Sequence, residues 1–294
     1  MAMWKHAQGW NIRADMTSCV PSSFTITPGT GAEGAWVDVL SSTMAEAGHF
    51  LRIGWNAIFT SGANRGCLLD IAISVGGTRY VVVRQLNVCQ VPRSMQIATS
   101  STGQNPQLFF PCYVPSGAQV SIRARGSVAT TFTVSCEVWS NRTIGGKGSY
   151  AQARAIVDGT AHPDSYGPDT TNFKGVTVVP SASANTFGST VQIAASTAHP
   201  YDGFIIGYGG VNSTSVTTST AYRIQLCDSA ATTIFYDGIS GVAITTPNYS
   251  LHYPFDRVAW LQNAMPTGTA VYARCMGSIA SSSSVSLTLH GLRK

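Results

Sequence analysis

The chain has 294 residues, of which 44% are hydrophobic and only 11% are charged, and its formal net charge at pH 7 is +5. About 25% of the residues of an average soluble protein are charged. Glu and Lys, which solvate the outer faces of surface helices, occur here only three and four times. This composition excludes a mainly helical protein, and the abundance of Ser, Thr, Val and Gly predicts an all-β fold.

The distribution of the positive charge argues against nucleic acid as a partner. Arginines are spread singly from Arg13 to Arg293 with no basic run, whereas a nucleic-acid-binding domain usually carries a clustered patch or a recognisable motif. No window approaches the roughly 18 consecutive apolar residues of a membrane-spanning helix. The first residues lack the apolar segment of a secretory signal. We therefore expect synthesis in the cytoplasm of a host, and no membrane partner.

Residues 1–20 are predicted to form an N-terminal arm. This segment places Trp4 and Trp10 on a polar background. Exposed tryptophans of an arm usually lie against their own domain or a neighbouring subunit, because the large ring gains free energy by being covered. Trp4 and Trp10 are therefore interface candidates.

The stretch Val114–Ala129, which reads VPSGAQVSIRARGSVA, predicts a turn followed by a strand. Successive side chains of a strand point to opposite faces. Apolar side chains from Val120 to Ala124 therefore share the core face, and Arg123 and Arg125 share the outer face. A second alternating run, Phe132–Val138, follows a Gly-Ser pair. We expect these two strands to pair as a hairpin with one buried face.

The same phrase returns at Met265–Ala280 as MPTGTAVYARCMGSIA, with Arg274 on the outer face and a further alternating run at Val285–Leu289. Upstream matches keep the same order. They pair Gly34–Thr43 with Gly188–Thr197, Phe50–Trp55 with Phe204–Tyr208, and Leu69–Ser74 with Tyr222–Cys227. We interpret this collinear series as a tandem duplication.

Each copy holds roughly eight short strand-like runs separated by Gly, Pro and Asn, a density typical of a β-sandwich, either a jelly roll or another Greek-key form. The predicted fold is thus all-β, with two tandem jelly-roll-like β-sandwich domains. The first domain covers residues 21–142 and the second covers 176–294. Residues 143–175 between them are rich in Gly, Pro and Asp and are predicted to be a linker with a few anchoring contacts.

The seven cysteines are scattered singly, with no CxxC pair. An odd, unpatterned set in a protein made in the cytoplasm favours cysteines that act as small buried hydrophobic residues. Disulfides stay open as an alternative, for a particle that later meets oxidising surroundings.

The residue types of catalytic and metal sites form no recognisable pattern. The six histidines never occur as HxH, HxxxH or HExxH, which are common zinc-ligand spacings. The 13 carboxylates are widely separated and match no calcium loop. The nucleophile motif GxSxG is absent. We therefore expect a non-enzymatic protein without catalytic residues, metal or cofactor.

Aromatic residues leave one binding alternative open, because flat rings stack on sugar faces while carboxylates and amides bind hydroxyls. Trp36 and Trp55 lie in apolar runs, which favours packing over binding. The better glycan candidates lie in predicted loops of the second copy: Tyr201, Tyr236, Asp237 and Tyr249.

Two segments, Pro115–Ser135 and Pro266–Ser286, share a Pro-[Ser/Thr]-Gly turn, a Val-x-x-Arg strand, a Gly-Ser pair and an amphipathic strand. This phrase, in a chain rich in Ser, Thr and Gly and poor in Lys and Glu, resembles virion structural proteins of tailed bacteriophages. Those proteins are built from β-sandwich or jelly-roll modules. The phrase is structural, so the resemblance brings no catalytic residues.

The sequence thus predicts a structural virion component that decorates or joins head, neck or tail. The expected partners are further copies of the chain, as a trimer or higher oligomer, and other virion proteins. Arg123, Arg125 and Arg274 suit pairing with carboxylates of an adjoining subunit, because a guanidinium binds a carboxylate through two parallel hydrogen bonds. The alternative is a receptor module of a fibre or spike that binds a host surface glycan. A secreted-type hydrolase is a third hypothesis.

Overall fold

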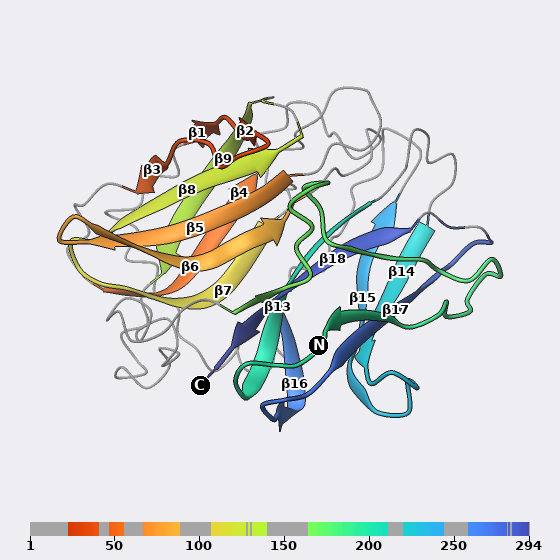
Figure 1. Ribbon diagram of the computed structural model, residues 1–294. Helices are drawn as coiled ribbons and strands as arrows, with labels where there is room; N and C mark the ends of the chain where they lie inside the picture. Colours follow the sequence, from red (N-terminus) through yellow and green to blue (C-terminus); the bar gives the residue numbers. More distant parts are fainter. Residues whose placement is uncertain are drawn as a thin grey trace.

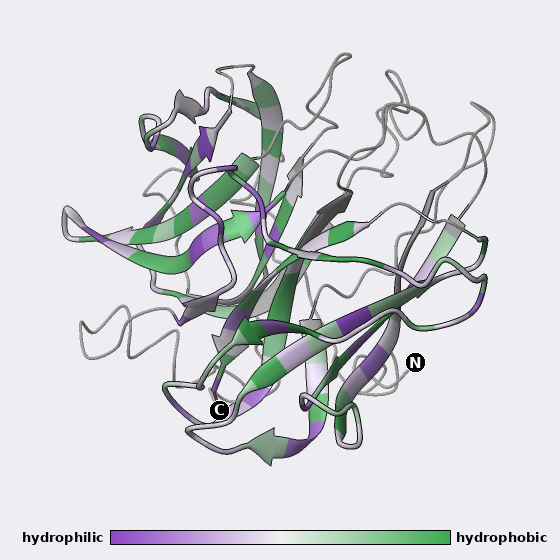
Figure 2. Cartoon of the chain, turned by 45° about the vertical axis from the view of Figure 1, so that its right-hand side comes forward, coloured by the Kyte–Doolittle hydropathy of each residue, from purple (hydrophilic) through white to green (hydrophobic). Residues whose placement is uncertain are grey.

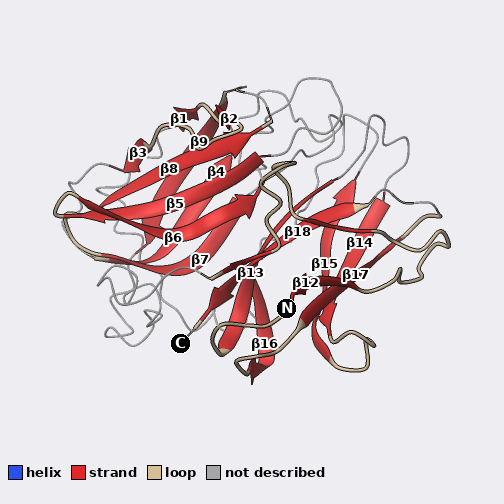
Figure 3. Ribbon diagram, viewed as in Figure 1, coloured by secondary structure: helices blue, strands red, loops and turns tan. Residues whose placement is uncertain are grey.

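A computed structural model describes residues 23–40, 47–55, 67–88, 107–127, 129, 131–139, 164–210, 220–243, 258–280, 282 and 284–293. Every regular element in these ranges is a β-strand (Figure 3). The described residues form no helix that could cross a membrane. Trp4, Trp10 and Tyr249 lie outside the described residues, so their predicted roles stay predictions.

The first half of the chain forms two sheets (Figure 1). One sheet has the strand order β1-β9-β4-β7 and the other has the order β2-β8-β5-β6, with β3 also paired to β8. The strands are β1 (Ser23–Ile26), β2 (Gly29–Thr30), β3 (Val37–Leu40), β4 (Gly48–Trp55), β5 (Cys67–Val75), β6 (Thr78–Asn87), β7 (Gln107–Val114), β8 (Gln119–Gly126) and β9 (Phe132–Trp139).

The second half repeats this plan. Its sheets have the orders β10-β18-β13-β16, with β11 also paired to β18, and β12-β17-β14-β15. The strands are β10 (Ser165–Tyr166), β11 (Val176–Val178), β12 (Val191–Ala194), β13 (Tyr201–Gly210), β14 (Thr220–Cys227), β15 (Ile234–Ala243), β16 (Val258–Met265), β17 (Val271–Gly277) and β18 (Val285–Leu292). Strand β10 lies within the predicted linker, residues 143–175, and pairs with β18 of the second half.

Both halves are jelly rolls. Without β2, the first half has eight strands, counted in chain order from β1 to β9. In one sheet, the first strand pairs with the eighth (β1–β9), the third with the eighth (β4–β9) and the third with the sixth (β4–β7). The other sheet pairs second with seventh, fourth with seventh and fourth with fifth. Strands β11 to β18 follow the same rule, which is the double Greek key of a jelly roll. The predicted all-β fold of two tandem β-sandwiches is confirmed.

The duplication extends to hydrogen-bond details. The β3–β8 pair has an irregularity between Asp38 and Leu40, and the β12–β17 pair has one at the matching place between Gln192 and Ala194. The amide of Gly34 bonds to the carbonyl of Ala124, and that of Gly188 bonds to the carbonyl of Cys275. A Cβ at either glycine would lie within 2.5 Å of a backbone oxygen. Both positions therefore require glycine for the same close approach.

The predicted hairpin at the end of each copy is wrong. Strand β8 pairs with β3 and β5, whereas β9 pairs with β1 and β4 in the opposite sheet. Strands β17 and β18 separate in the same way. The residues between the two strands let the chain cross from one layer to the other. Both apolar faces then point into the sandwich from opposite sides, a result that alternation alone cannot distinguish from a hairpin.

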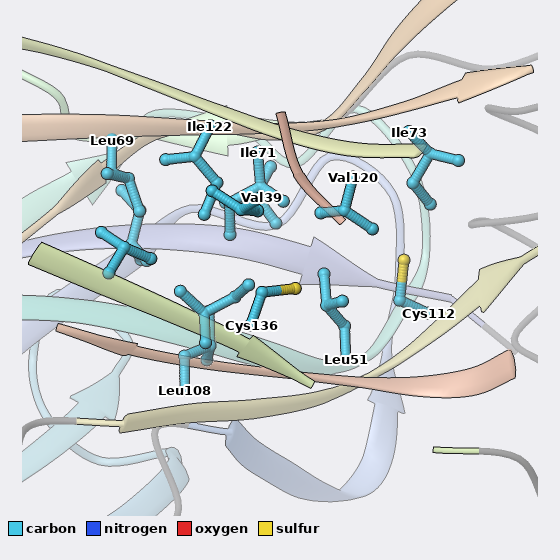
Figure 4. Close-up of a cluster of buried hydrophobic side chains, with 14 of the residues drawn as sticks. Val39, Leu51, Leu69, Ile71, Ile73, Leu108, Cys112, Val120, Ile122 and Cys136 are labelled. Carbon is cyan, nitrogen blue, oxygen red and sulfur yellow. The ribbon is translucent and has the colours of Figure 1, made fainter. Parts of the chain in front are cut away.

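Each sandwich encloses its own hydrophobic core. In the first core, side chains of β3, β5 and β8 face those of β4, β7 and β9 (Figure 4). Bands of alternating hydropathy run along the strands (Figure 2). The five described cysteines, Cys67, Cys112, Cys136, Cys227 and Cys275, are free thiols buried in the protein. Burial raises the pKa of Cys112 and Cys275 to about 12, so these thiols stay protonated and act as small apolar groups.

Strand β18 differs from its counterpart β9 because both of its faces are buried. Leu287 and Leu289 belong to the second core. The alternate side chains are polar, yet Ser286 and Thr288 have no exposed surface. In β9, the corresponding polar face is partly exposed. The expectation that the last strand of each copy buries only one face is therefore wrong for the second copy.

The first jelly roll covers the polar face of β18. The side-chain amide of Asn87, at the end of β6, donates to the carbonyl and the hydroxyl of Ser286 at 2.9 and 2.7 Å. The backbone N–H of Asn87 donates to Thr288 Oγ1 at 3.0 Å. Ile205 and Leu292, from the second jelly roll, pack into the first core. We call this contact between β6 and the β13–β18 pair the junction.

His290 lies in the same row of β18 as Ser286 and Thr288 and is 3% exposed. Its Nδ1 atom is buried without a hydrogen-bond partner, and its Nε2 atom lies 3.4 Å from Thr288 Oγ1. Burial lowers the pKa of His290 from 6.5 to about 3, because desolvation disfavours the charged imidazolium.

Asn87→Ala is expected to weaken the junction, because it removes the side-chain amide that donates to the carbonyl and the hydroxyl of Ser286. Loss of a donor to buried polar groups costs about 1–3 kcal/mol. Chemical denaturation followed by tryptophan fluorescence measures the change. The matched control is Asn263→Ala, at an exposed position of β16. Equal stability losses in the two variants would contradict a special role for Asn87.

The free energy of unfolding is expected to decrease as the pH is lowered, because His290 is buried in its neutral form. In the unfolded chain, the imidazole of His290 binds a proton near pH 6.5, whereas in the folded chain it does so only near pH 3. This contribution is therefore complete above pH 6.5 and declines below it, by about 1.4 kcal/mol for each pH unit. Denaturation of the wild type and of His290→Gln between pH 7.5 and 5.5 tests this. An unchanged pH slope in the variant would disprove it.

Candidate functional site

The outer face of the β3-β8-β5-β6 sheet carries a buried ion pair. Asp70 on β5 lies opposite Arg123 on β8. Arg123 donates from Nε to Asp70 Oδ2 at 2.8 Å, and Asp70 is only 4% exposed. The other carboxylate oxygen accepts the backbone N–H of Gln85 at 2.8 Å. Gln85 has a φ of 55° at a β-bulge, so Asp70 both pairs with Arg123 and holds the bulge.

An aromatic ring completes this face. The guanidinium carbons of Arg123 and Arg79 lie 4.5 and 5.1 Å from the centroid of the Trp36 ring. Both distances are in the range of cation–π contacts. Asp38 accepts from Ser121 Oγ at 2.6 Å and pairs with Arg79 at 3.3 Å. Trp36 is thus the centre of a polar outer surface, whereas the sequence favoured simple packing for it.

The second jelly roll builds a similar face on the β12-β17-β14-β15 sheet. Arg274 on β17 lies opposite Gln225 on β14 and donates from Nε to its Oε1 at 2.8 Å. The amide of Gln225 donates to Asp237 Oδ2 at 2.7 Å. Asp237 also accepts two hydrogen bonds from Arg223. Phe187 has the position that Trp36 has in the first face, because two arginines lie over its ring. The guanidinium carbons of Arg274 and Arg223 lie 4.5 and 5.9 Å from the centroid of Phe187.

These contacts set the charge state of Asp237. Desolvation raises its pKa, but hydrogen bonds from Arg223 and Gln225, with the charges of Arg223 and Arg274, outweigh that effect and lower the pKa of Asp237. The same hydrogen bonds raise the pKa of Arg223. Asp237 therefore stays an anion that is committed to its neighbours.

The two faces differ at one matched position. Asp70 and Gln225 lie opposite the equivalent arginines of the repeated phrase. The first copy thus has a carboxylate for Arg123, and the second has a neutral amide for Arg274. The face of each jelly roll around its arginines and aromatic ring is the candidate functional surface of this protein, and we call it the arginine face.

The three arginines predicted as interface residues all lie on the outer surface of their strands, as alternation indicated. Arg123 pairs with Asp70, and Arg125 lies 3.4 Å from Glu33. Arg274 has its amide partner Gln225. Their contacts with another subunit stay a prediction.

Tyr201 is not a glycan candidate, because it is fully buried and a ring without exposed surface cannot stack on a sugar. Its hydroxyl donates to Asp164 at 2.6 Å and lies 2.7 Å from the hydroxyl of Tyr166. Burial and these hydrogen bonds raise the pKa of Tyr201. His199 Nδ1 lies 2.9 Å from the same Asp164 oxygen. This cluster fastens β10 to β13 and leaves Tyr201 protonated.

Tyr236 and Asp237 also have roles within the fold. Tyr236 packs against the second core and lies so close to Gly238 that a Cβ there would meet the Tyr236 hydroxyl at 2.2 Å. Asp237 belongs to the arginine face. Within the described residues, no group of three His, Cys, Asp or Glu side chains could hold a metal ion.

Sequence reasoning missed the aromatic centres of the two faces. Trp36 lies two residues after Gly34, and Phe187 lies directly before Gly188. These glycines are equivalent in the two copies. An aromatic residue within two positions of the equivalent glycine in both copies was the signal that could have identified these rings. Because the two rings lie on opposite sides of that glycine in sequence, a residue-by-residue match does not align them.

No protein-family model and no curated protein matches the chain. Among solved structures, it is similar to a chain of Sulfolobus turreted icosahedral virus, with 10% identity and a TM-score of 0.34 over 94% of this chain and 90% of that one. It is also similar to the STIV MCP, with 11% identity, a TM-score of 0.30 and coverage of 92% and 96%.

A third similar structure is the N-terminal CBM22-1–CBM22-2 tandem domain of Xyn10C from Paenibacillus barcinonensis. It has 8% identity and a TM-score of 0.25, over 97% of this chain and 94% of that one. All three likenesses are distant. They carry no information about activity.

Asp70→Ala is expected to destabilise the protein strongly. It leaves Arg123 without its buried partner and removes the acceptor of the Gln85 bulge, and breaking a buried pair costs about 3–5 kcal/mol. The matched control is Glu33→Ala, which removes the partner of Arg125 on the same face and whose side chain is 34% exposed. An exposed pair contributes about 0–1 kcal/mol. Thermal and urea unfolding of both variants test this, and equal losses would contradict it.

Proposed function

We propose that this chain is a non-enzymatic structural component of a virus particle that assembles through protein–protein contacts. The observation that carries the proposal is the pair of complete jelly rolls in one chain, joined by a junction that buries polar and apolar groups of both. Jelly rolls with two Greek keys are typical of viral capsid and lectin domains. The repeated phrase, which resembles those of tailed-bacteriophage virion proteins, favours the particle.

The physical demands on a particle component agree with this fold. Such a component needs rigid modules and surfaces that are reused in every copy. At the junction, Ile205 and Leu292 of the second jelly roll are part of the first core, which couples the two modules. The guanidinium of Arg274, whose Nε is bound to a neutral amide, offers a directional contact to a carboxylate.

The glycan alternative has less support from the described residues. Tyr201 is buried, Tyr236 packs on the core, and both oxygens of Asp237 are engaged by Arg223 and Gln225. These observations favour the virion proposal over the glycan alternative, and within it we propose a subunit that decorates or joins the head, neck or tail of a tailed phage.

Two measurements test this role. Light scattering of the purified protein is expected to show a homo-oligomer, a trimer or larger, and mass spectrometry of intact, purified particles from the source is expected to detect the chain. The junction variant Asn87→Ala, compared with Asn263→Ala, is expected to reduce incorporation into particles. A monomeric protein that is missing from intact particles would overturn the proposal.

A further inference from the structure

Arg274 differs from the other arginines of the two arginine faces. Among the described residues, each of the other four has a carboxylate oxygen within 4.0 Å, and Arg274 has none. Those four pairs are Arg79–Asp38, Arg123–Asp70, Arg125–Glu33 and Arg223–Asp237. Asp237 is near enough for the charge of Arg274 to lower its pKa, but its hydrogen bonds come from Arg223 and Gln225.

The guanidinium of Arg274 is fixed in position. Its Nε donates to Gln225, and its Cζ lies over the Phe187 ring, 4.5 Å from the centroid. Gln225 is only 6% exposed and is held at its other end by Asp237. These contacts leave Nη1 and Nη2 without a hydrogen-bond partner in the described part of the chain. A fixed guanidinium loses little conformational entropy when it binds a planar anion.

The first copy indicates what such an arginine binds. Arg123, at the equivalent place, takes the carboxylate of Asp70 from within the chain. In the second copy, Gln225 stands where that acid would be. The chemistry that fits the remaining donors of Arg274 is therefore a carboxylate from outside the chain, bound by two parallel charge-assisted hydrogen bonds.

The described surface of another copy offers no carboxylate that is free of partners. Eight of the acidic residues have hydrogen bonds or ion pairs within the chain: Glu33, Asp38, Asp70, Glu137, Asp164, Asp169, Asp228 and Asp237. Asp202 has an interaction as well. The chain also carries a net charge of +5, which disfavours self-association through this surface and favours an acidic partner.

We infer that the arginine face of the second jelly roll, centred on Arg274 and Phe187, binds an acidic segment of a different protein. This inference rests on the proposed structural role and names the chemistry of one of its partners. The carboxylate of a Glu or Asp side chain occupies Nη1 and Nη2 of Arg274.

The test measures binding of a fluorescein-labelled oligoglutamate peptide to the full chain by fluorescence anisotropy, with oligoglutamine as the uncharged control, at an ionic strength of about 0.15 M, where the Debye length is about 8 Å. Arg274→Gln is expected to weaken binding by about tenfold or more, the effect of losing hydrogen bonds to a charged group. Arg274→Lys keeps the charge but lacks the planar fork, so it is expected to lose most of the binding. Thermal melting verifies that each variant folds.

The matched control is Arg84→Gln, which removes one charge from an exposed side chain of β6. It is expected to change the affinity less than about twofold, because long-range charge is screened. Equal losses in Arg84→Gln and Arg274→Gln would overturn the inference, as would normal binding by Arg274→Lys. Binding of polysialic acid through Arg274 without binding of oligoglutamate would replace the protein partner with a glycan.

Particle incorporation of the same variants separates this inference from the proposed function. A chain that is present in particles but binds the peptide independently of Arg274 contradicts only the inference. A chain that binds the peptide through Arg274 but is missing from particles contradicts only the virion role.

Discussion

Hydrogen bonds from Asn87 to Ser286 and Thr288 tie the first jelly roll to the second, and the arrangement of the molecule depends on them. A buried hydroxyl or amide without a partner is costly. The polar face of β18 can therefore be covered only by a surface that supplies donors and acceptors at the right places. The end of β6 supplies them to Ser286 and Thr288, and this requirement fixes which part of the first jelly roll can lie on β18.

The bulge in β6 links the junction to the arginine face. Asp70 holds the backbone N–H of Gln85 and pairs with Arg123 on the outer face. The neighbouring carbonyl of Arg84 accepts a hydrogen bond from Ser165 of the second jelly roll. The space around the junction is tight as well, because a Cβ at Gly207 would meet the backbone nitrogen of Asn87 at 2.7 Å. The packing of the two jelly rolls therefore depends on Asp70, which holds the bulge and is paired with Arg123 on the outer surface.

The sequence was sufficient for the fold class because alternation and duplication are local and repeated signals. It correctly placed Arg123 and Arg274 on outer faces. It could not show that β8 and β9 lie in opposite sheets, because an amphipathic strand has the same pattern in either layer. It also could not show that Ser286 and Thr288 are buried, because a polar face under another domain has the same sequence as a polar face in water. Aligned by sequence, Asp70 matches Arg223, whereas strand register matches it with Gln225. The shift of two residues keeps the side chains on the same faces and is invisible to hydropathy.

The duplicated modules have diverged in opposite senses at two surfaces. In the first, the arginine of the repeated phrase is satisfied by Asp70, and the polar face of β9 is left partly exposed. In the second, the polar face of β18 is covered, and the arginine has an uncharged partner in Gln225. Each module therefore keeps a different surface available, although both have the same strand order. Within the proposed structural role, two unlike outward surfaces suit heterologous contacts, in which a patch on one subunit meets a different patch on its neighbour. Divergence at a few polar positions, rather than a change of fold, is enough to give one chain two unlike surfaces.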